Sequence, residues 1–340
     1  MSAAPTSLLR LRARVARSLA GSLALLVLLF AVAWVVVHAF GAGFGVHGNI
    51  PQFIIVTLNG LTLAGLYFIV ASGFTLIFGL MRVVNMAHGS LYLLGGYIAL
   101  QLLRHQAVNY WVAVLLAALA IGVFGLVMQQ LFLRWNQGQE LRQALITIAL
   151  SIILGDQMIS TFGASAVTIN APDGLAGSVE LGLYDIRYPT FRLVVLGLAV
   201  LVGAALWYGI KRMRFGIILR AGVDDRDMAS ALGVNVQVVF AVTFFIGAVL
   251  GGLGGVLGGT MIALAPGQDA SFLLSSLVVV IVGGLGSLGG AAVGALALGL
   301  VDQLSGVYLP AGYTNFAILL TFALLVLVLA TRPRGMFGRR

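Results

Sequence analysis

Apolar runs follow one another along almost the whole chain, and most of them have the roughly 20 residues that an α-helix needs to cross a membrane. Hydrophobic residues make up 61% of the 340 residues and charged residues only 9%, and the mean hydropathy is +1.09. Soluble domains do not reach these values, so lipid is the solvent for this fold. Backbone groups in lipid must be hydrogen-bonded within the protein, and unbroken apolar runs favour helices over barrel strands. The sequence therefore predicts an all-α integral membrane protein.

About ten runs qualify as transmembrane helices by length and hydropathy. One region is ambiguous, because residues 271–309 could form one bent helix or two short helices separated at the glycine-rich stretch 283–290. The predicted spans are residues 18–40, 51–80, 88–103, 110–133, 142–162, 190–210, 236–263, 271–285, 290–308 and 314–331.

The distribution of Lys and Arg favours two helices in the ambiguous region. With two helices, sixteen of the nineteen basic residues fall on one side of the membrane, and only Arg104, Arg187 and Arg192 fall on the other. With one helix the split is twelve against seven. Cytoplasmic loops carry the excess of basic residues in membrane proteins. We therefore expect an even number of spans, both termini in the cytoplasm, and a net charge of +9 that reflects topology rather than nucleic-acid binding.

Two parts make up the predicted organisation. Residues 1–45 form a basic cytoplasmic tail and an extra anchor helix, because the apolar run is longer than the roughly 7 to 15 residues of a signal-peptide core; a cleaved signal peptide is the alternative. Residues 46–340 form the core. The outer loop 162–189 divides the ten spans into two groups of five, as an internal pseudo-repeat would, although the halves show no convincing sequence match.

Residues 211–235, which we call the polar segment, form the longest charge-dense interruption of the apolar pattern. The polar segment holds five of the nineteen basic and three of the ten acidic residues. Three of its features predict a short amphipathic helix: acidic residues at the start that complement the helix dipole, an apolar stripe at i and i+4, and a glycine that ends the helix. Such a helix would dock into a groove of a soluble partner; a solvated loop is the alternative. The residues concerned are Asp224, Asp225, Asp227, Met228, Leu232 and Gly233.

The run 51–80 is too long for one straight span, since thirty residues extend about 45 Å against a hydrocarbon core of about 30 Å. We expect it to tilt or to break at Gly73 and Gly79. Its polar residues Asn59, Thr62 and Ser72 make it the predicted wall of a translocation pathway, because unwound helix at membrane depth is tolerated only inside protein or beside a watery cavity.

Polar residues elsewhere in the spans leave two interpretations open. Asn85 and His88, with Ser90, are expected near the cytoplasmic boundary, either in a plain polar turn or in a gate or coupling contact. Asp156 and Asp302 are expected either at helix ends in the membrane interface or in a permeation role.

Glycine is abundant, with 45 residues, and two glycine-rich stretches space small residues by three and four. This pattern predicts close packing between helix backbones; the alternative is sliding between helices during transport. The two stretches are residues 247–259 and 289–299.

Catalysis has little support in the sequence. With no cysteine, the chain has neither disulfides nor thiolate metal sites, and its four histidines form no metal or protease motif, so we expect no metal and no catalytic residue. Residues 284–289 match the dinucleotide fingerprint formally, but no strand is expected before them. The chain has no Walker A motif, and its one lysine is Lys211. We therefore expect no bound cofactor, and any ATP chemistry belongs to other chains.

Several stretches together resemble the permease subunits of branched-chain amino acid ABC importers. They are residues 59–67 (NGLTLAGLY), 73–89 (GFTLIFGLMRVVNMAHG), 94–97 (LGGY), 145–152 (LITIALSI), 220–221 (RA), 227–229 (DMA), 232–235 (LGVN), 282–290 (VGGLGSLGG) and 332–338 (RPRGMFG). The similarity covers about residues 51–338, which is almost the whole predicted core. It departs from the usual pattern at Ser90, where an acidic residue is common, and in the extra helix before residue 45.

The resemblance implies a type II-like permease in the bacterial cytoplasmic (inner) membrane. Its implied partners are a second related permease subunit, two cytoplasmic ATP-binding subunits, and an extracytoplasmic solute-binding protein. It also implies that the region matching residues 220–235 docks on the ATPase, which adds Arg220 and Ala229 to the residues of the polar segment. Alternatives are a urea or short-amide permease of the same family, an ATP-independent channel or carrier, and a purely structural membrane subunit.

Overall fold

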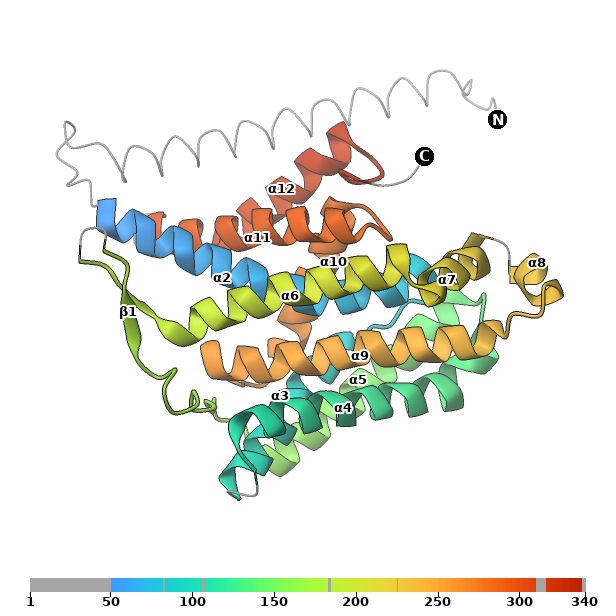
Figure 1. Ribbon diagram of the computed structural model, residues 1–340, viewed down its shortest axis with the longest axis horizontal. Helices are drawn as coiled ribbons and strands as arrows, with labels where there is room; N and C mark the ends of the chain where they lie inside the picture. Colours follow the sequence, from blue (N-terminus) through green and yellow to red (C-terminus); the bar gives the residue numbers. More distant parts are fainter. Residues whose placement is uncertain are drawn as a thin grey trace, which may run out of the picture.

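The computed structural model describes residues 50–81, 83–105, 108–182, 185–224, 226–309 and 316–337. These residues form a helix bundle with one two-stranded antiparallel hairpin in the outer loop (Figure 1). The predicted anchor helix 18–40 and the N-terminal tail lie outside the described residues. The elements are α2 (Ile50–Phe74), a π-helical turn (Thr75–Leu80), α3 (His88–Arg104), α4 (Tyr110–Met128) with its extension (Gln129–Asn136), α5 (Glu140–Phe162), β1 (Ser178–Glu180), β2 (Arg187–Pro189), α6 (Thr190–Arg212), α7 (Arg214–Asp224), α8 (Arg226–Ala231), α9 (Val236–Met261), α10 (Gln268–Gly283), α11 (Leu288–Tyr308) and α12 (Ala317–Thr331).

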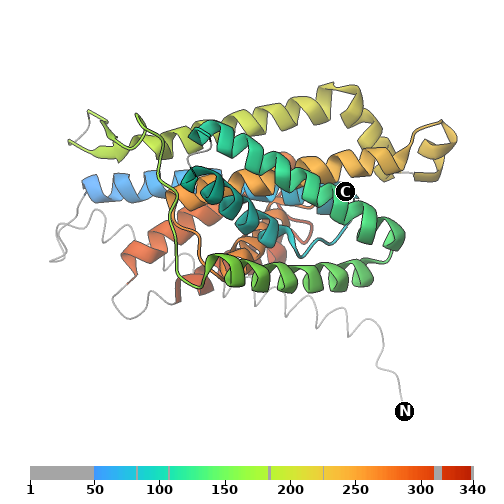
Figure 2. The ribbon, with the colours of Figure 1, turned by 90° about the horizontal axis from the view of Figure 1, so that it is seen from below.

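Helix α2 lies at the centre of the bundle, where it packs against α11, α9, α6 and α10. The long helices run along a common direction (Figure 1), and α5 and α6 lie on opposite faces of the molecule (Figure 2). In the most apolar 18 residues of each of these two outer helices, only 11% are buried, compared with 61% in α9. Most of the apolar surface of α5 and α6 is therefore available to lipid or to another protein.

The all-helical prediction is confirmed, and six helices of the described residues are long and apolar enough to cross a membrane. Two shorter apolar helices, α10 and α12, have 16 and 15 residues, and α3, which is less apolar, has 17. They extend only about 22 to 26 Å at 1.5 Å per residue, less than the core of about 30 Å. The count of ten spans therefore stays a prediction.

Helix α3 is short because it begins inside the protein, where it packs on the first turn of α10. The ring of His88 lies beside the Val70 carbonyl near the end of α2, and Gly89 packs so closely on Asp269 that a Cβ atom would lie 1.9 Å from the Asp269 carbonyl oxygen. The irregular chain before α3 is held by α5, since the Met86 N–H donates to Thr147 Oγ1 at 3.0 Å. Such backbone is stable at this depth because it is enclosed by protein.

The prediction that glycine allows close helix packing is confirmed. A Cβ atom on Gly255 of α9 would lie 1.7 Å from the Tyr92 carbonyl oxygen of α3, and one on Gly299 of α11 would lie 2.6 Å from the Gly60 carbonyl oxygen of α2. Helix α2 does not break at Gly73, because this glycine instead brings α2 against α9, where a Cβ atom would lie 2.5 Å from the Gly247 carbonyl oxygen. The chain continues as helix and widens into the π-helical turn.

Residues 271–309 form two helices, as the charge distribution predicted. Helix α10 ends at Gly283 and α11 begins at Leu288. Gly284 and Gly286 have φ angles of +102° and +76°, which glycine adopts without strain. The Ser287 hydroxyl accepts a hydrogen bond from the Gly290 N–H at 3.0 Å and caps α11. Residues 284–289 follow helix α10 rather than a strand. This agrees with the expectation that their match to the dinucleotide fingerprint is only formal.

Candidate functional site

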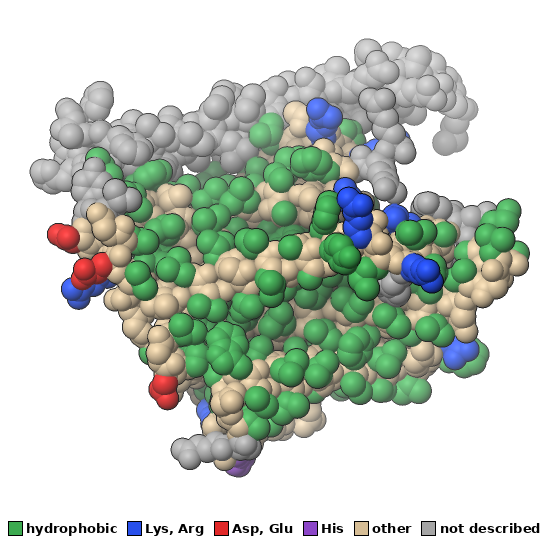
Figure 3. All heavy atoms as spheres, in the orientation of Figure 1, with side chains coloured by type: hydrophobic (Ala, Val, Ile, Leu, Met, Phe, Trp, Pro, Cys, Tyr) green, Lys and Arg blue, Asp and Glu red, His purple; other side chains and the backbone are tan. Residues whose placement is uncertain are grey.

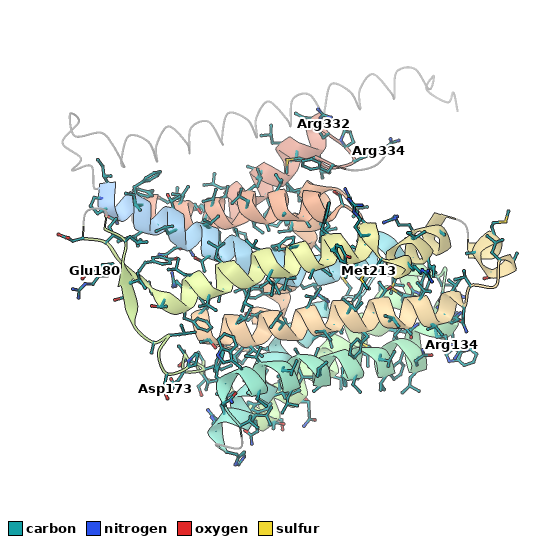
Figure 4. All side chains as sticks on the ribbon, in the orientation of Figure 1. Arg134, Asp173, Glu180, Met213, Arg332 and Arg334 are labelled. Atoms are coloured by element: carbon teal, nitrogen blue, oxygen red, sulfur yellow. The ribbon has the colours of Figure 1, made fainter. Side chains whose placement is uncertain are left out.

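Basic side chains gather at one end of the bundle. On the face shown in Figure 3, most Lys and Arg side chains lie toward the end that carries α7 and α8, and the acidic side chains described on this face lie at the other end. Arg134, Arg332 and Arg334 lie at the first end together with Met213, whereas Asp173 and Glu180 lie at the second (Figure 4). The grouping that positive-inside reasoning required is therefore present, with the polar segment and the C-terminal arginines at the same end.

The polar segment contains two helices where the sequence predicted one. Helix α6 ends at Arg212, and α7 begins two residues later at Arg214. The Arg220 guanidinium donates to the Ile210 carbonyl, which belongs to the last turn of α6 and has no helical partner there. Arg220 therefore ties α7 back onto the end of α6.

The predicted helix stop at Gly233 is confirmed. Gly233 has a φ angle of +83°, the left-handed conformation that glycine adopts at helix ends. The Val234 N–H donates to the Ala229 carbonyl at 3.1 Å, and the Gly233 N–H donates to the Ser230 carbonyl at 3.0 Å. These bonds satisfy the last carbonyls of α8 and give it a defined end.

Helix α8 is anchored to the bundle by a buried residue, and large apolar side chains beside it are exposed. Ala229 is only 3% exposed and packs in a core cluster with Met81 and Val236, whereas Met228 is 59% exposed and Leu232 is 77% exposed. We call Met228 of α8 and Leu232, which directly follows this helix, the α8 apolar pair. Large apolar side chains held outward in this way are typical of an interaction surface.

The three aspartates of the polar segment are only partly described. The backbone of Asp224 ends α7 and that of Asp227 lies in α8, while Asp225 lies outside the described residues. The sequence also allows Asp224 or Asp225 to cap the predicted helix, and this capping stays a prediction.

Two of the five predicted pathway residues join α2 to the outer hairpin and α6. Asn59 Oδ1 accepts a hydrogen bond from the Arg192 guanidinium. The Thr62 hydroxyl donates to the Leu58 carbonyl at 2.9 Å, so Tyr188, whose hydroxyl lies 2.8 Å away, donates to Thr62. Thr62 and Tyr188 are each 1% exposed. This contact fixes the start of α6 against α2.

Replacing Tyr188 with phenylalanine is expected to lower the stability of the protein by about 1 kcal/mol, because it removes one buried hydrogen bond. The apparent Tm in detergent should fall by a few degrees. Tyr208→Phe is the matched control, since Tyr208 lies on α6 and is 58% exposed. An equal loss in both variants would contradict a structural role for the Thr62–Tyr188 contact.

The other three predicted pathway residues are fully buried. Ser72 donates to the Ile69 carbonyl of its own helix at 2.8 Å, and Asn85 Oδ1 accepts from the Ala87 N–H at 3.1 Å. The Nε2 atom of His88 lies 3.0 Å from the Val70 carbonyl oxygen, and its ring meets Phe74 edge-on at 5.5 Å. Asn85 and His88 were expected near the cytoplasmic boundary, which stays a prediction. His88 lies beside Val70, near the end of α2, and beside Gly251 of α9, which leaves room for its ring.

Two cavities lie elsewhere. The larger, about 500 Å³, lies between α4 and α9 at the α8 end and is lined by Gln130, Arg134, Asn235 and Gln237 among other residues. The smaller, about 230 Å³, is bordered by α2, α10, α11 and α12, and Asp302 lies on its wall. None of the five predicted pathway residues lines either cavity.

Sequence reasoning named Asp302 but not its partner. The Tyr67 hydroxyl donates to Asp302 Oδ2 at 2.8 Å, which joins α2 to α11. The sequence signal for Tyr67 is that it places a hydroxyl group within the apolar run 51–80. A second group that the sequence missed connects α3, α5 and α10: the Ser90 hydroxyl lies 2.7 Å from that of Ser151 and 3.4 Å from Asp269 Oδ2.

Known proteins resemble the chain over most of its length. The family model described as branched-chain amino acid transport system / permease component matches residues 56–329. The high-affinity branched-chain amino acid transport system permease proteins LivH of Escherichia coli (strain K12) and LivH of Salmonella typhimurium are each 30% identical to it over 294 residues, which is 83% of this chain and 94% of each relative. The corresponding protein BraD of Pseudomonas aeruginosa is 30% identical over 297 residues, with the same coverage.

The family match spans every described helix from the second turn of α2 to the last turn of α12, and thus includes the polar segment, α8 and both cavities. The helical architecture and the concentration of basic residues at one end agree with a multi-pass membrane permease. The chain therefore belongs to the family of permease components of branched-chain amino acid transport systems.

Proposed function

We propose that this chain is the transmembrane permease subunit of an ABC importer that translocates branched-chain amino acids. ATP hydrolysis takes place on separate subunits, and this chain supplies the membrane path. The family match over residues 56–329 carries the proposal, and the named transport activity of relatives at 30% identity supports the substrate class.

The α8 apolar pair is the proposed contact with the ATP-binding subunits. Helix α8 lies at the basic end of the bundle (Figure 1), and positive-inside reasoning assigns that end to the cytoplasm. Ala229 links α8 to a core cluster that contains Val236 and Phe240 of α9. A push on α8 would therefore be transmitted directly to α9, the most buried of the membrane-length helices.

The remaining partners and the topology follow from the same proposal. A second related permease subunit would cover an exposed apolar face, and α5 and α6 each offer one. A solute-binding protein would approach the opposite end, where the hairpin presents the ion pair of Arg187 and Glu180 at 2.7 Å. Both termini in the cytoplasm, ten spans with a pseudo-repeat, and a pathway that includes Asn59, Thr62, Ser72, Asn85 and His88 belong to this proposal.

Uptake of radiolabelled leucine, isoleucine and valine by cells with and without this chain tests the function. We expect uptake that depends on the chain and stops when cellular ATP is depleted. Urea and acetamide, supplied in parallel, should not enter by this route. Chain-dependent uptake that persists without ATP would instead indicate a channel or carrier, and unchanged uptake after deletion would indicate a structural subunit.

A further inference from the structure

Asp302 places a carboxylate inside α11, a helix long and apolar enough to cross the membrane. It lies six residues before Tyr308, the last residue of α11, which is about 9 Å along the helix axis. The 21 residues of α11 extend only about as far as the hydrocarbon core is thick. Asp302 therefore lies about two turns inside α11, and a carboxylate within a membrane span is costly unless something compensates its charge.

The described residues supply only part of that compensation. The single hydrogen bond to the carboxylate comes from the Tyr67 hydroxyl at 2.8 Å. Within the described ranges, no Lys, Arg or His lies within ion-pairing distance of Asp302, and the one ion pair there joins Arg187 to Glu180. A carboxylate that retains acceptor positions on the wall of a cavity is suited to bind a cation.

The cavity around Asp302 has a polar and an apolar part. Hydroxyl groups of Ser271, Ser275 and Thr321 line it together with Tyr67, and the rest of the wall is aliphatic or aromatic, from Leu274, Val278, Leu298, Ile318 and Phe322. Three of these apolar side chains, Leu274, Ile318 and Phe322, are 38% to 52% exposed, so the cavity opens at the surface between α10 and α12.

The volume fits a small amino acid. A cavity of about 150 Å³ holds benzene, which has about six non-hydrogen atoms. By proportion, about 230 Å³ accommodates about nine non-hydrogen atoms, the size of leucine or isoleucine.

We propose that this cavity is an intramembrane binding site for the zwitterion of an aliphatic amino acid. The α-ammonium group of the ligand binds the Asp302 carboxylate, the hydroxyl groups of the cavity face its carboxylate, and the branched side chain contacts Leu298 and Phe322. Tyr67 is a positioning residue that orients the carboxylate of Asp302. The inference rests on the proposed function and adds to it a substrate-binding site within the transmembrane helices.

Direct binding of radiolabelled leucine to the assembled complex in lipid nanodiscs, without any solute-binding protein, tests the proposal. Wild-type complex should bind leucine saturably and should bind 4-methylpentanoate, which lacks the ammonium group, much more weakly. Asp302→Asn should weaken leucine binding by about 10- to 100-fold, the effect of losing a hydrogen bond to a charged group, and should remove most of the preference for leucine. Asp173→Asn, at an exposed position of the outer loop, is the matched control and should bind as the wild type does.

Two further variants separate binding from folding. Tyr67→Phe removes the structural hydrogen bond but leaves the charge, so it should retain the preference for the ammonium group. Ser275→Leu fills the cavity and should abolish binding of both ligands while preserving the assembled complex. The proposal is overturned if wild-type complex shows no saturable leucine binding, or if Asp302→Asn weakens both ligands equally. Continued ATP-dependent leucine uptake by the wild type would show that the proposed function stands even then.

Discussion

An acidic residue at each position of the α8 apolar pair is expected to abolish transport without unfolding the protein. Met228 and Leu232 are exposed, so the Met228→Glu/Leu232→Glu variant disturbs little of the permease itself. In an apolar groove of an ATP-binding subunit, however, two buried carboxylates would be left without partners. Hot-spot residues at the centre of an interface cost about 2 kcal/mol or more of binding free energy when they are truncated. We expect ATP-binding subunits to be lost during purification and leucine uptake to fall at least tenfold.

Val179→Glu is the control for the added charge. Val179 is 43% exposed in β1, at the opposite end of the molecule from α8. This variant should keep the ATP-binding subunits at the wild-type level. If the Met228→Glu/Leu232→Glu variant also retained them and transported normally, the ATP-binding subunits would have to dock elsewhere.

Substitution of Gly255 is expected to prevent the bundle from assembling. A Cβ atom at this position would lie 1.7 Å from the Tyr92 carbonyl oxygen, and backbone cannot move aside as a flexible side chain does. The helices would have to separate along the whole α3–α9 interface, which contains Gly95 and Gly252 in similarly close contact. Overpacking costs about 1 to 3 kcal/mol where side chains can adjust, and we expect more here. Gly255→Leu should leave almost no folded protein in detergent extracts, and Gly255→Ala should lower the yield strongly.

The matched substitution is Gly197→Ala. Gly197 lies in the interior of α6, and no atom outside its own helix backbone lies within 4 Å of the position that an alanine methyl group would take. The added methyl group therefore points into open space, and alanine is favoured over glycine in helices by about 1 kcal/mol. Normal yield from Gly197→Ala together with normal yield from Gly255→Ala would show that the α3–α9 contact is not as tight as the geometry indicates.

Features that depend on local chemistry could be predicted from the sequence. Gly233 ends α8 because a left-handed residue is needed there, and glycine adopts that conformation without cost. The break between α10 and α11 follows from clustered glycines and a serine cap. Positive-inside reasoning grouped the C-terminal arginines with the polar segment because it depends only on the order of the spans.

Features that depend on distant partners could not be predicted. The hydrogen bond between Thr62 and Tyr188, which lies 126 positions further along the chain, has no signal in the sequence around either residue. The depth of His88 depends on Val70 and on the space left by Gly251. Helix α7 was missed because its charges predicted solvent exposure rather than the bond between Arg220 and Ile210 that holds it. Periodicity identifies the face of a helix, but it does not identify the residue that the face meets.

The central position of α2 has a consequence for biosynthesis. Helix α2 ends at Phe74, while α11, its most extensive packing partner, begins at Leu288. During translation α2 must therefore wait in lipid, with Gly60 and its neighbours uncovered, until nearly all of the chain has been inserted. Contacts between such distant segments form late and slowly. Nascent chains that stop before α11 should be recognised by membrane quality control as incomplete, even though every helix that they contain is inserted correctly.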